Sequence, residues 1–412
     1  MEVKTTRYSI KTIGLILASL FTCLQTSEAQ PRMAGLFDFQ VKDGQPGANY
    51  ESTYNHDDSA TFAVGRVTLF LDADINEEMY FTGELQSDLF NTQARNTDFY
   101  IRTAAVTVTD VPKWRTNIQF GRFNSIFGTY VNRRLPLDNP LFDAPLAYSH
   151  LVNLDLDAGW VTPDFNISTT EDVRSISLAG KQQIGTGVKF FAPVRGTKLN
   201  YALSLTNNPS SNPRQINTNG GLTASMKMHW IADHTTNFGF SFSSGSYLNS
   251  LGKLDPNNAS MRDPILGAAL TAPQLETSSY LQTKFGFHWN WERERYQVHT
   301  EYIASSFDVP NNPSDDTLDS ASFYIEGKYN FTKNLFGAAR YDMLTFEDNV
   351  YAPLNVGVAQ KWDDNVTRIE IGMGNFINES TLAKVTYQTT DYDLPDNQKD
   401  YDLFAGQVSV IF

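Results

Sequence analysis

Residues Leu281 to Ile303 read LQTKFGFHWNWERERYQVHTEYI and alternate in character from one residue to the next. One parity is apolar from Phe285 to Trp291, whereas the other is polar and includes Lys284 and His288. A period of two residues predicts β-strand, and the charged run Glu292-Arg293-Glu294 predicts a tight turn between two strands. The stretch therefore predicts a β-hairpin with one apolar and one polar face.

The same hairpin pattern recurs along the chain, with short turns at residues 76–78, 332–334 and 378–379. Between residues 63 and 73 we expect Ala63, Gly65 and Val67 to share the apolar face and Arg66 to lie opposite them. The first strand is expected at Ala34 to Val41 and the last at Tyr401 to Phe412. The count comes to about sixteen strands, with fourteen or eighteen as alternatives because residues 183–207 are the least regular.

Repeated hairpins of this kind predict an all-β fold, a transmembrane antiparallel β-barrel with short periplasmic turns and long extracellular loops. A soluble β-sandwich also alternates, but it places aromatic residues without regard to strand ends. Here a set of aromatic residues lies within a few residues of short turns, as an interfacial girdle requires: Trp114, Trp230, Trp289, Trp291, Tyr296, Tyr329 and Phe331. About sixteen strands would enclose an aqueous lumen.

The amino terminus predicts a cleaved signal peptide over residues 1–29. Three basic residues, up to Lys11, precede a mostly apolar run from Ile13 to Leu24, which is followed by Ser27-Glu28-Ala29. That run is too short to span a bilayer as a helix, which takes about 20 residues. Residues 30–412 then form one barrel domain. A lipoprotein modified at Cys23, the single cysteine, is the alternative.

The composition narrows the function classes. The formal charge of −14 argues against nucleic-acid binding, and one cysteine within the signal leaves no thiolate zinc site or disulfide. No Gly-rich phosphate loop, EF-hand or nucleotide motif is present, so no cofactor is expected.

The carboxyl-terminal strand carries a candidate assembly signal. Phe404, Val408, Val410 and Phe412 share one parity, so the chain ends on a lipid-facing aromatic residue. This pattern resembles the terminal signature of bacterial outer-membrane barrels, which implies recognition by the barrel-assembly machinery.

The longest stretch without a clean strand pattern runs from residue 124 to 181. Loops of this length are usually functional or disordered. We expect part of it to fold into the lumen and to constrict the pore, with charged residues across the opening, and a surface-packed extracellular loop is the alternative. The constriction candidates are Arg122, Arg133, Arg134, Asp138 and Asp143. Further ordering residues of this stretch are Tyr148, Asp155, Asp157 and Trp160.

The segment GRFNSIFGTYVNRRLPLDNPLFDAPLAY, from Gly121 to Tyr148, resembles the strand-and-loop region of large bacterial porins, and the nearest type is the phosphate-selective porin. The resemblance implies a barrel of about sixteen strands, often trimeric, with a basic constriction for oxyanions. The sequence departs from that type in having no long lysine ladder and an acidic total charge.

The expected function is passive diffusion of small hydrophilic solutes and ions through a wet lumen of mixed charge in a Gram-negative outer membrane. The polar parity supplies the expected pore lining: Arg66, Asp72, Glu84, Lys284, Glu326, Lys328, Arg340, Asp342, Arg368, Glu370 and Lys384. Expected partners are membrane lipid and lipopolysaccharide, the solutes, and further copies of the chain in a homotrimer. A plugged structural or adhesive barrel is the main alternative.

Two catalytic or metal-binding possibilities remain open. A hairpin centred between Arg293 and Glu294 would place His288 opposite His299, near Glu301, as a weak metal-site candidate; the plainer interpretation is wet lumen lining. An outer-membrane hydrolase is the other alternative, although no compact nucleophile motif such as G-x-S-x-G is present and we expect no enzyme.

Overall fold

The computed structural model describes residues 31–44, 60–88, 99–112, 115–152, 154, 177–179, 184–207, 220–248, 277–308, 317–349, 360–393 and 399–412. The predicted signal peptide, with Cys23, lies outside these residues, as do Trp114, Asp155, Asp157 and Trp160. Among the described residues, no helix combines the length and apolar character needed to cross a membrane.

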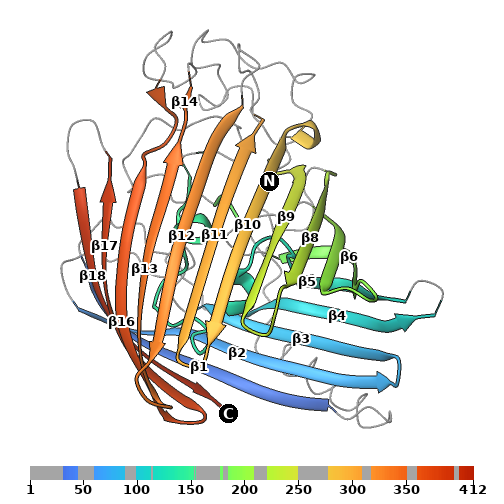
Figure 1. Cartoon of the computed structure of the whole chain (residues 1–412), viewed down its shortest axis with the longest axis horizontal. Coiled ribbons are helices and arrows are strands. Elements are labelled where there is room, and N and C mark those ends of the chain that lie inside the picture. Colours follow the sequence, from blue (N-terminus) through green and yellow to red (C-terminus); the bar gives the residue numbers. More distant parts are fainter. Residues whose placement is uncertain are drawn as a thin grey trace, which may run out of the picture.

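Sixteen antiparallel strands form a closed barrel, in agreement with the predicted count and fold class (Figure 1). The barrel strands are β1 (Pro31–Gly44), β2 (Thr61–Asn76), β3 (Met79–Asp88), β4 (Phe99–Val111), β5 (Thr116–Asn124), β6 (Ile184–Pro193), β7 (Leu199–Asn207), β8 (Leu222–Ile231), β9 (Thr236–Ser246), β10 (Leu281–Arg293), β11 (Tyr296–Phe307), β12 (Leu318–Asn330), β13 (Leu335–Phe346), β16 (Val366–Asn378), β17 (Thr381–Tyr392) and β18 (Lys399–Ile411). Each strand pairs with its neighbour along the chain, and β1 pairs with β18 to close the ring. Closure leaves no unpaired sheet edge.

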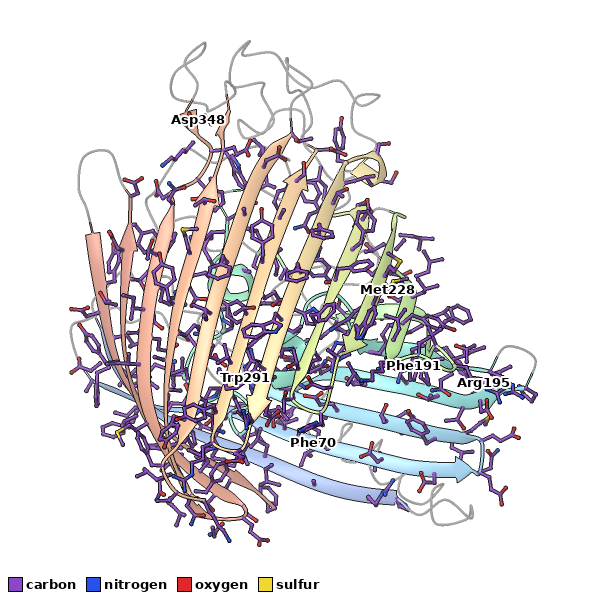
Figure 2. The ribbon with its side chains drawn as sticks, viewed as in Figure 1. Phe70, Phe191, Arg195, Met228, Trp291 and Asp348 are labelled. Carbon is purple, nitrogen blue, oxygen red and sulfur yellow. The ribbon has the colours of Figure 1, made fainter. Side chains whose placement is uncertain are left out.

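The connections alternate between short and long, as predicted. Short turns join β2 to β3, β4 to β5, β6 to β7, β8 to β9, β10 to β11, β12 to β13 and β16 to β17, whereas every other connection within the barrel is longer. The β13–β16 connection contains a small two-stranded sheet of β14 (Asp348–Asn349) and β15 (Gln360–Lys361). Figure 2 places Asp348 at the opposite end of the barrel wall from Trp291, which precedes a short turn.

The barrel wall separates an apolar outer face from a polar inner face. On β16, Ile369, Ile371 and Met373 are exposed, whereas Arg368 and Glu370 between them are buried. The alternation that predicted the strands therefore also fixes which side chains point inward. Near the short turns, outward aromatic rings contact one another, such as Tyr296 with Tyr329 at 4.8 Å between ring centroids.

The predicted face of the first residues of β2 is wrong because a β-bulge lies there. Asp38 of β1 pairs with Arg66, but Phe39 pairs with Val64, so Gly65 is an extra residue in β2. Ala63 therefore pairs with the buried Gln40 and is only 3% exposed. An extra residue shifts the alternation by one position, which a strict period of two cannot anticipate.

The predicted register of the β10–β11 hairpin is wrong by two residues. His288 pairs with Glu301, and His299 pairs with Asn290. The turn residues are Glu294 and Arg295, and Glu294 has a φ of 44°, in the left-handed region. His288 and His299 therefore do not face each other across this pair of strands.

Candidate constriction of the lumen

The β5–β6 loop, residues 125–183, lies inside the ring of strands over the part that the structure describes (Figure 1). It contains a 3-10 turn, η1 (Tyr130–Arg133), and a short helix, α2 (Leu146–Ser149). Its side chains and backbone bond to inward-facing residues of β3, β8, β9, β11, β12, β13, β16 and β17.

Two consecutive arginines of the loop, Arg133 and Arg134, bond to strands on nearly opposite sides of the lumen. Arg133 donates to Glu326 on β12 and, at 3.1 Å, to the hydroxyl of Tyr324. Arg134 donates to Glu84 on β3. Strands β12 and β3 are seven strands apart in one direction round the ring and nine in the other, so the loop joins nearly opposite walls. Burial, with the nearby Arg102, lowers the pKa of Arg134 to about 10, which leaves it charged at neutral pH.

A buried charge cluster fastens the loop to the β12–β16 wall, and its centre is Arg340 on β13. Arg340 contacts Glu326 at 3.2 Å, Asp342 at 2.8 Å and Glu370 at 2.7 Å. It also donates to the carbonyl oxygen of Asp143 in the loop, at 2.9 Å. Charge-assisted bonds to a fully buried guanidinium are strong only when every partner is in place, so this cluster fixes one loop position.

Backbone groups of the loop complete the attachment. Lys384 on β17 donates to the carbonyl oxygens of Pro136, Asn139 and Leu141 at 2.8 to 2.9 Å. An ammonium group has three donors, so the loop satisfies all of them. The backbone N–H of Phe142 donates to Glu370 at 2.7 Å.

The amino-terminal end of the loop is held by β8, β9 and β11. Lys227 on β8 donates to the carbonyl of Gly128, and the Gly128 N–H donates to Ser241 Oγ at 3.1 Å. Tyr148 donates to Glu301 on β11 at 2.6 Å. Burial raises the pKa of Tyr148 well above its usual range, and Glu301 raises it further, so the hydroxyl keeps its proton.

An apolar cluster fills the space between the loop and the β11–β16 wall. Phe127, Leu146 and Leu154 of the loop pack into one buried cluster with Phe307, Phe346 and other wall residues. Trp362 also belongs to this cluster and lies 4.8 Å from Phe346 between ring centroids. On this side the described loop and wall are packed against each other.

On the other side, between the loop and strands β2–β8, a hollow of about 410 Å³ remains. Its charged lining residues are Asp72, Glu84, Lys189 and Lys227. Glu84 is occupied by Arg134 and lies 3.9 Å from Arg102. The nearby Phe191 faces Lys189 and is labelled in Figure 2, with Phe70 of the lining on β2.

All the residues predicted to line the pore point to the inner face, but the loop divides them into two groups. Most of them are buried: Lys284, Glu326, Arg340, Asp342, Arg368, Glu370 and Lys384, together with Glu84. Asp72 is exposed, and Arg66 and Lys328 are half-buried. Because several of the buried charges bond the loop, they hold it in place and water does not surround them.

The predicted constriction residues differ in their positions. Arg133 and Arg134 bridge the lumen, and Asp143 lies in the loop near Arg368, at 3.9 Å. Asp138 is exposed in the same loop. Arg122 is separate from them, because it pairs with Ala104 and Thr186 and has the parity of the outward-facing Phe120.

Sequence reasoning missed two residues of this region, Lys189 and Lys227, and it named Tyr148 as an ordering residue of the loop without predicting its partner. Lys227 and His229 alternate with Met226 and Met228, a strand signal that could have identified Lys227 as inward-facing. Lys189 lies in the stretch that we found least regular. Tyr148 contacts Glu301 at 153 residues' separation, and no sequence period reports such a contact.

The inner face also brings two histidines together across β9. His229 Nδ1 and His288 Nε2 are 3.1 Å apart, beside Gly239, whose missing side chain leaves room for the His288 ring. The ring centroids are 5.4 Å apart, so the two nitrogens lie between the ring centres, as in a direct N–H···N hydrogen bond. Among the described residues, no group of three or more His, Cys, Asp or Glu could hold a metal ion.

Among the described residues, His150 is a buried histidine next to a serine, Ser149, but the two do not form a hydrolytic arrangement. His150 lies 3.7 Å from Asp363, but Ser149 Oγ is engaged with the carbonyl oxygens of Ala144 and Pro145 and with Arg368. These bonds direct the hydroxyl away from the role of a nucleophile activated by His150.

No protein-family model matches the sequence, and no curated protein matches it. Solved structures do match the fold. The outer membrane channel DcaP of Acinetobacter baumannii has 12% identity and a TM-score of 0.58, with 93% of this chain and 97% of that chain covered. The fold is that of outer-membrane porins and channels.

Two further structures share this fold. The anion-selective porin from Comamonas acidovorans has 8% identity and a TM-score of 0.55, with 93% of this chain and 100% of that chain covered. OprB of Pseudomonas putida has 10% identity and a TM-score of 0.55, with 96% and 97% covered. At such identities the likeness concerns the fold, and none of these matches singles out the phosphate-selective type.

Proposed function

We propose that this protein is a porin of a bacterial outer membrane, which lets small hydrophilic solutes diffuse through a lumen narrowed by the β5–β6 loop. The observation that carries the proposal is the hollow between the loop and strands β2–β8, which remains although the loop joins opposite walls. Charged groups in that hollow, such as Asp72 and Lys189, keep a passage wet without binding any solute tightly.

The outer face supports the membrane location. Exposed apolar residues cover the wall, and aromatic pairs such as Trp230 with Phe238 lie beside the short turns. An apolar band bounded by aromatic residues is the surface that a bilayer covers. Lipid and lipopolysaccharide are then the surroundings of the wall, and the barrel-assembly machinery is the partner that inserts it.

Single-channel recording in planar bilayers with a salt gradient tests this proposal. We expect stepwise conductance increments, and liposomes containing the protein should swell in small sugars. The reversal potential should lean towards anions if the hollow controls selectivity, because the arginines beside it outnumber its carboxylates. Absence of both steps and swelling would contradict a porin.

A plugged structural or adhesive barrel is the second candidate, and the apolar cluster between the loop and the β11–β16 wall favours it. If a similar packing closed the β2–β8 side, conductance would be near zero. An outer-membrane hydrolase stays a weaker alternative, and its test is release of product from lipid or peptide substrates by the purified barrel.

Assembly into a homotrimer is a further part of the proposal. One neighbour in fold, an outer membrane protein of Vibrio cholerae, was solved in a trimer form at 12% identity and a TM-score of 0.52. Light scattering of the detergent-solubilised protein should give three times the chain mass, and a monomeric mass would contradict the trimer without affecting the channel.

A further inference from the structure

The hollow beside β2–β8 differs in charge from the chain as a whole. The chain has a formal charge of −14. Around Glu84, however, Arg134 and Arg102 both approach one carboxylate, and Arg66 donates to the Arg134 carbonyl at 3.3 Å. Three guanidinium groups therefore gather on this side of the lumen, where Asp72 and Glu84 are the carboxylates of the lining.

Lys189 supplies an ammonium group that faces the hollow. It lies 5.1 Å from the ring centroid of Phe123 and 4.9 Å from that of Phe191. Among the described residues it forms no ion pair, so the two aromatic rings hold the cation without neutralising it. A solute that enters the hollow therefore meets a positioned positive charge.

Apolar side chains lie on the same lining. Phe70 comes from β2, and Ile126 and Val131 come from the loop, together with Phe123. A hydrated inorganic ion gains no binding free energy from apolar surfaces. An apolar group gains binding free energy in proportion to the apolar area that is removed from water.

We propose that this hollow is a selectivity site for small organic anions in which a carboxylate is attached to an apolar group. The carboxylate approaches Lys189, and the apolar part lies against Phe70, Ile126 and Val131. This inference rests on the proposed porin function and adds the class of solute. Lys227, the other lysine of the lining, donates to the Gly128 carbonyl, so Lys189 is the ammonium group that meets the carboxylate. One such contact binds weakly, and weak binding is compatible with permeation.

Bi-ionic reversal potentials on single channels test the site. Sodium benzoate is the probe with a ring, sodium gluconate is an organic anion without an apolar group, and sodium phosphate is the inorganic oxyanion. We expect benzoate to be more permeant than gluconate and phosphate, measured relative to chloride. Lys189→Met keeps the length of the side chain and should lower the relative permeability of benzoate about fivefold, the effect of one unit charge at contact distance in water.

Lys333→Met is the matched control, because Lys333 is exposed in the short turn between β12 and β13. It removes the same charge and should leave the benzoate permeability unchanged. Ile126→Asn tests the apolar contact. It should reduce the permeability ratio of benzoate to gluconate and leave the permeability ratio of chloride to sodium unchanged.

The outcomes separate the two proposals. Conductance steps with no preference for benzoate over gluconate overturn the solute class and leave the porin standing. A preference for phosphate over benzoate overturns it as well, in favour of an inorganic oxyanion channel. An unchanged benzoate permeability in Lys189→Met overturns the assignment to Lys189. Absence of steps with every salt overturns the porin, and the solute class with it.

Discussion

Lys384 is the side chain whose removal should affect the loop most directly. Its ammonium group donates to three loop carbonyls, those of Pro136, Asn139 and Leu141. Lys384→Met fills the same volume but supplies no donor. A buried carbonyl without a partner costs about 1–3 kcal/mol, so the loop should leave this position for part of the time. We expect larger and noisier single-channel currents.

Lys333→Met again serves as the control for Lys384→Met, because it removes a lysine outside the lumen. An unchanged current trace in Lys384→Met would mean that the buried charge cluster alone holds the loop.

Gly128 is a second position at which a single substitution, the addition of a Cβ atom, should destabilise the protein. Its φ is 73°, and an added Cβ would lie 2.1 Å from Tyr148 Oη. Gly196, in the β6–β7 turn, has a φ of 74° and nothing within 4 Å of the same atom. Both alanine variants meet the left-handed penalty of about 1–2 kcal/mol, but only Gly128→Ala also displaces Tyr148.

The thermal unfolding midpoints of the two alanine variants check this difference. We expect Gly128→Ala to unfold at a lower temperature than Gly196→Ala, and to lose protection of the loop from added protease. Equal midpoints would show that Tyr148 moves aside without cost.

At the level of single residues, the sequence predicted orientation well and environment poorly. Arg340 and Glu370 were expected on the inner face, and both are buried there. Residues along a barrel strand alternate between the lipid side and the lumen side, and charged residues are unfavourable on the lipid side. Their burial beneath the loop depends on Asp143 and Phe142, which are about two hundred residues away in the chain. Periodicity carries no information about such contacts.

Among the elements, the β1–β18 seam closes the barrel and involves the terminal aromatic residue. Phe412 exchanges backbone hydrogen bonds with Gly35, at 2.7 and 3.0 Å, and its ring lies over Gly35, where a Cβ would be 2.5 Å from it. We expect Phe412→Ala to form less folded barrel, measured as the fraction that migrates as the compact form on an unboiled gel. The ring contributes seam packing, and it belongs to the predicted assembly signal.

Phe285→Ala is the control for the seam, because Phe285 is an outward aromatic residue of β10, at 45% exposure, far from the seam. In-vitro folding in detergent and assembly in cells separate the two roles of Phe412. A defect only in cells indicates recognition by the assembly machinery, whereas a defect in both indicates packing. A normal folded fraction in both would contradict each role.

The strands were predictable because consecutive residues of a membrane barrel strand alternate between an apolar and a polar face. The pairing registers of the strands were harder to predict. The β10–β11 turn contains Glu294 and Arg295, and no Gly or Asn marks the position with positive φ. A shift by two residues keeps every side chain on its face, so alternation cannot detect it. The pairing of His288 with His299 failed for that reason, whereas the pair with His229 needed the neighbouring Gly239.

At the scale of the whole molecule, the described part of the loop packs against the β11–β16 wall and leaves a hollow beside β2–β8. The sequence indicated that the 124–181 stretch could fold inward, and Arg133 and Arg134 were among the candidates for the opening. Which wall the loop would pack against was not predictable, because alternation identifies the inner face of each strand but not the part of that face which a loop contacts. The apolar residues of the loop itself, such as Phe127 and Leu146, decide it by packing with Phe307 and Phe346.

The orientation of the barrel in the membrane gives a final prediction. The single cysteine of the chain is Cys23, in the predicted signal, so one introduced cysteine reports one position. Lys333 lies in a short turn and Asp348 lies in the long β13–β16 connection, and both are exposed. In intact cells we expect Asp348→Cys to react with a polyethylene-glycol maleimide too large for the lumen, because long loops face outward in such barrels. Lys333→Cys should react only after the cells are broken. The reverse pattern would place the short turns outside the cell and the long connections in the periplasm, which would contradict the predicted orientation.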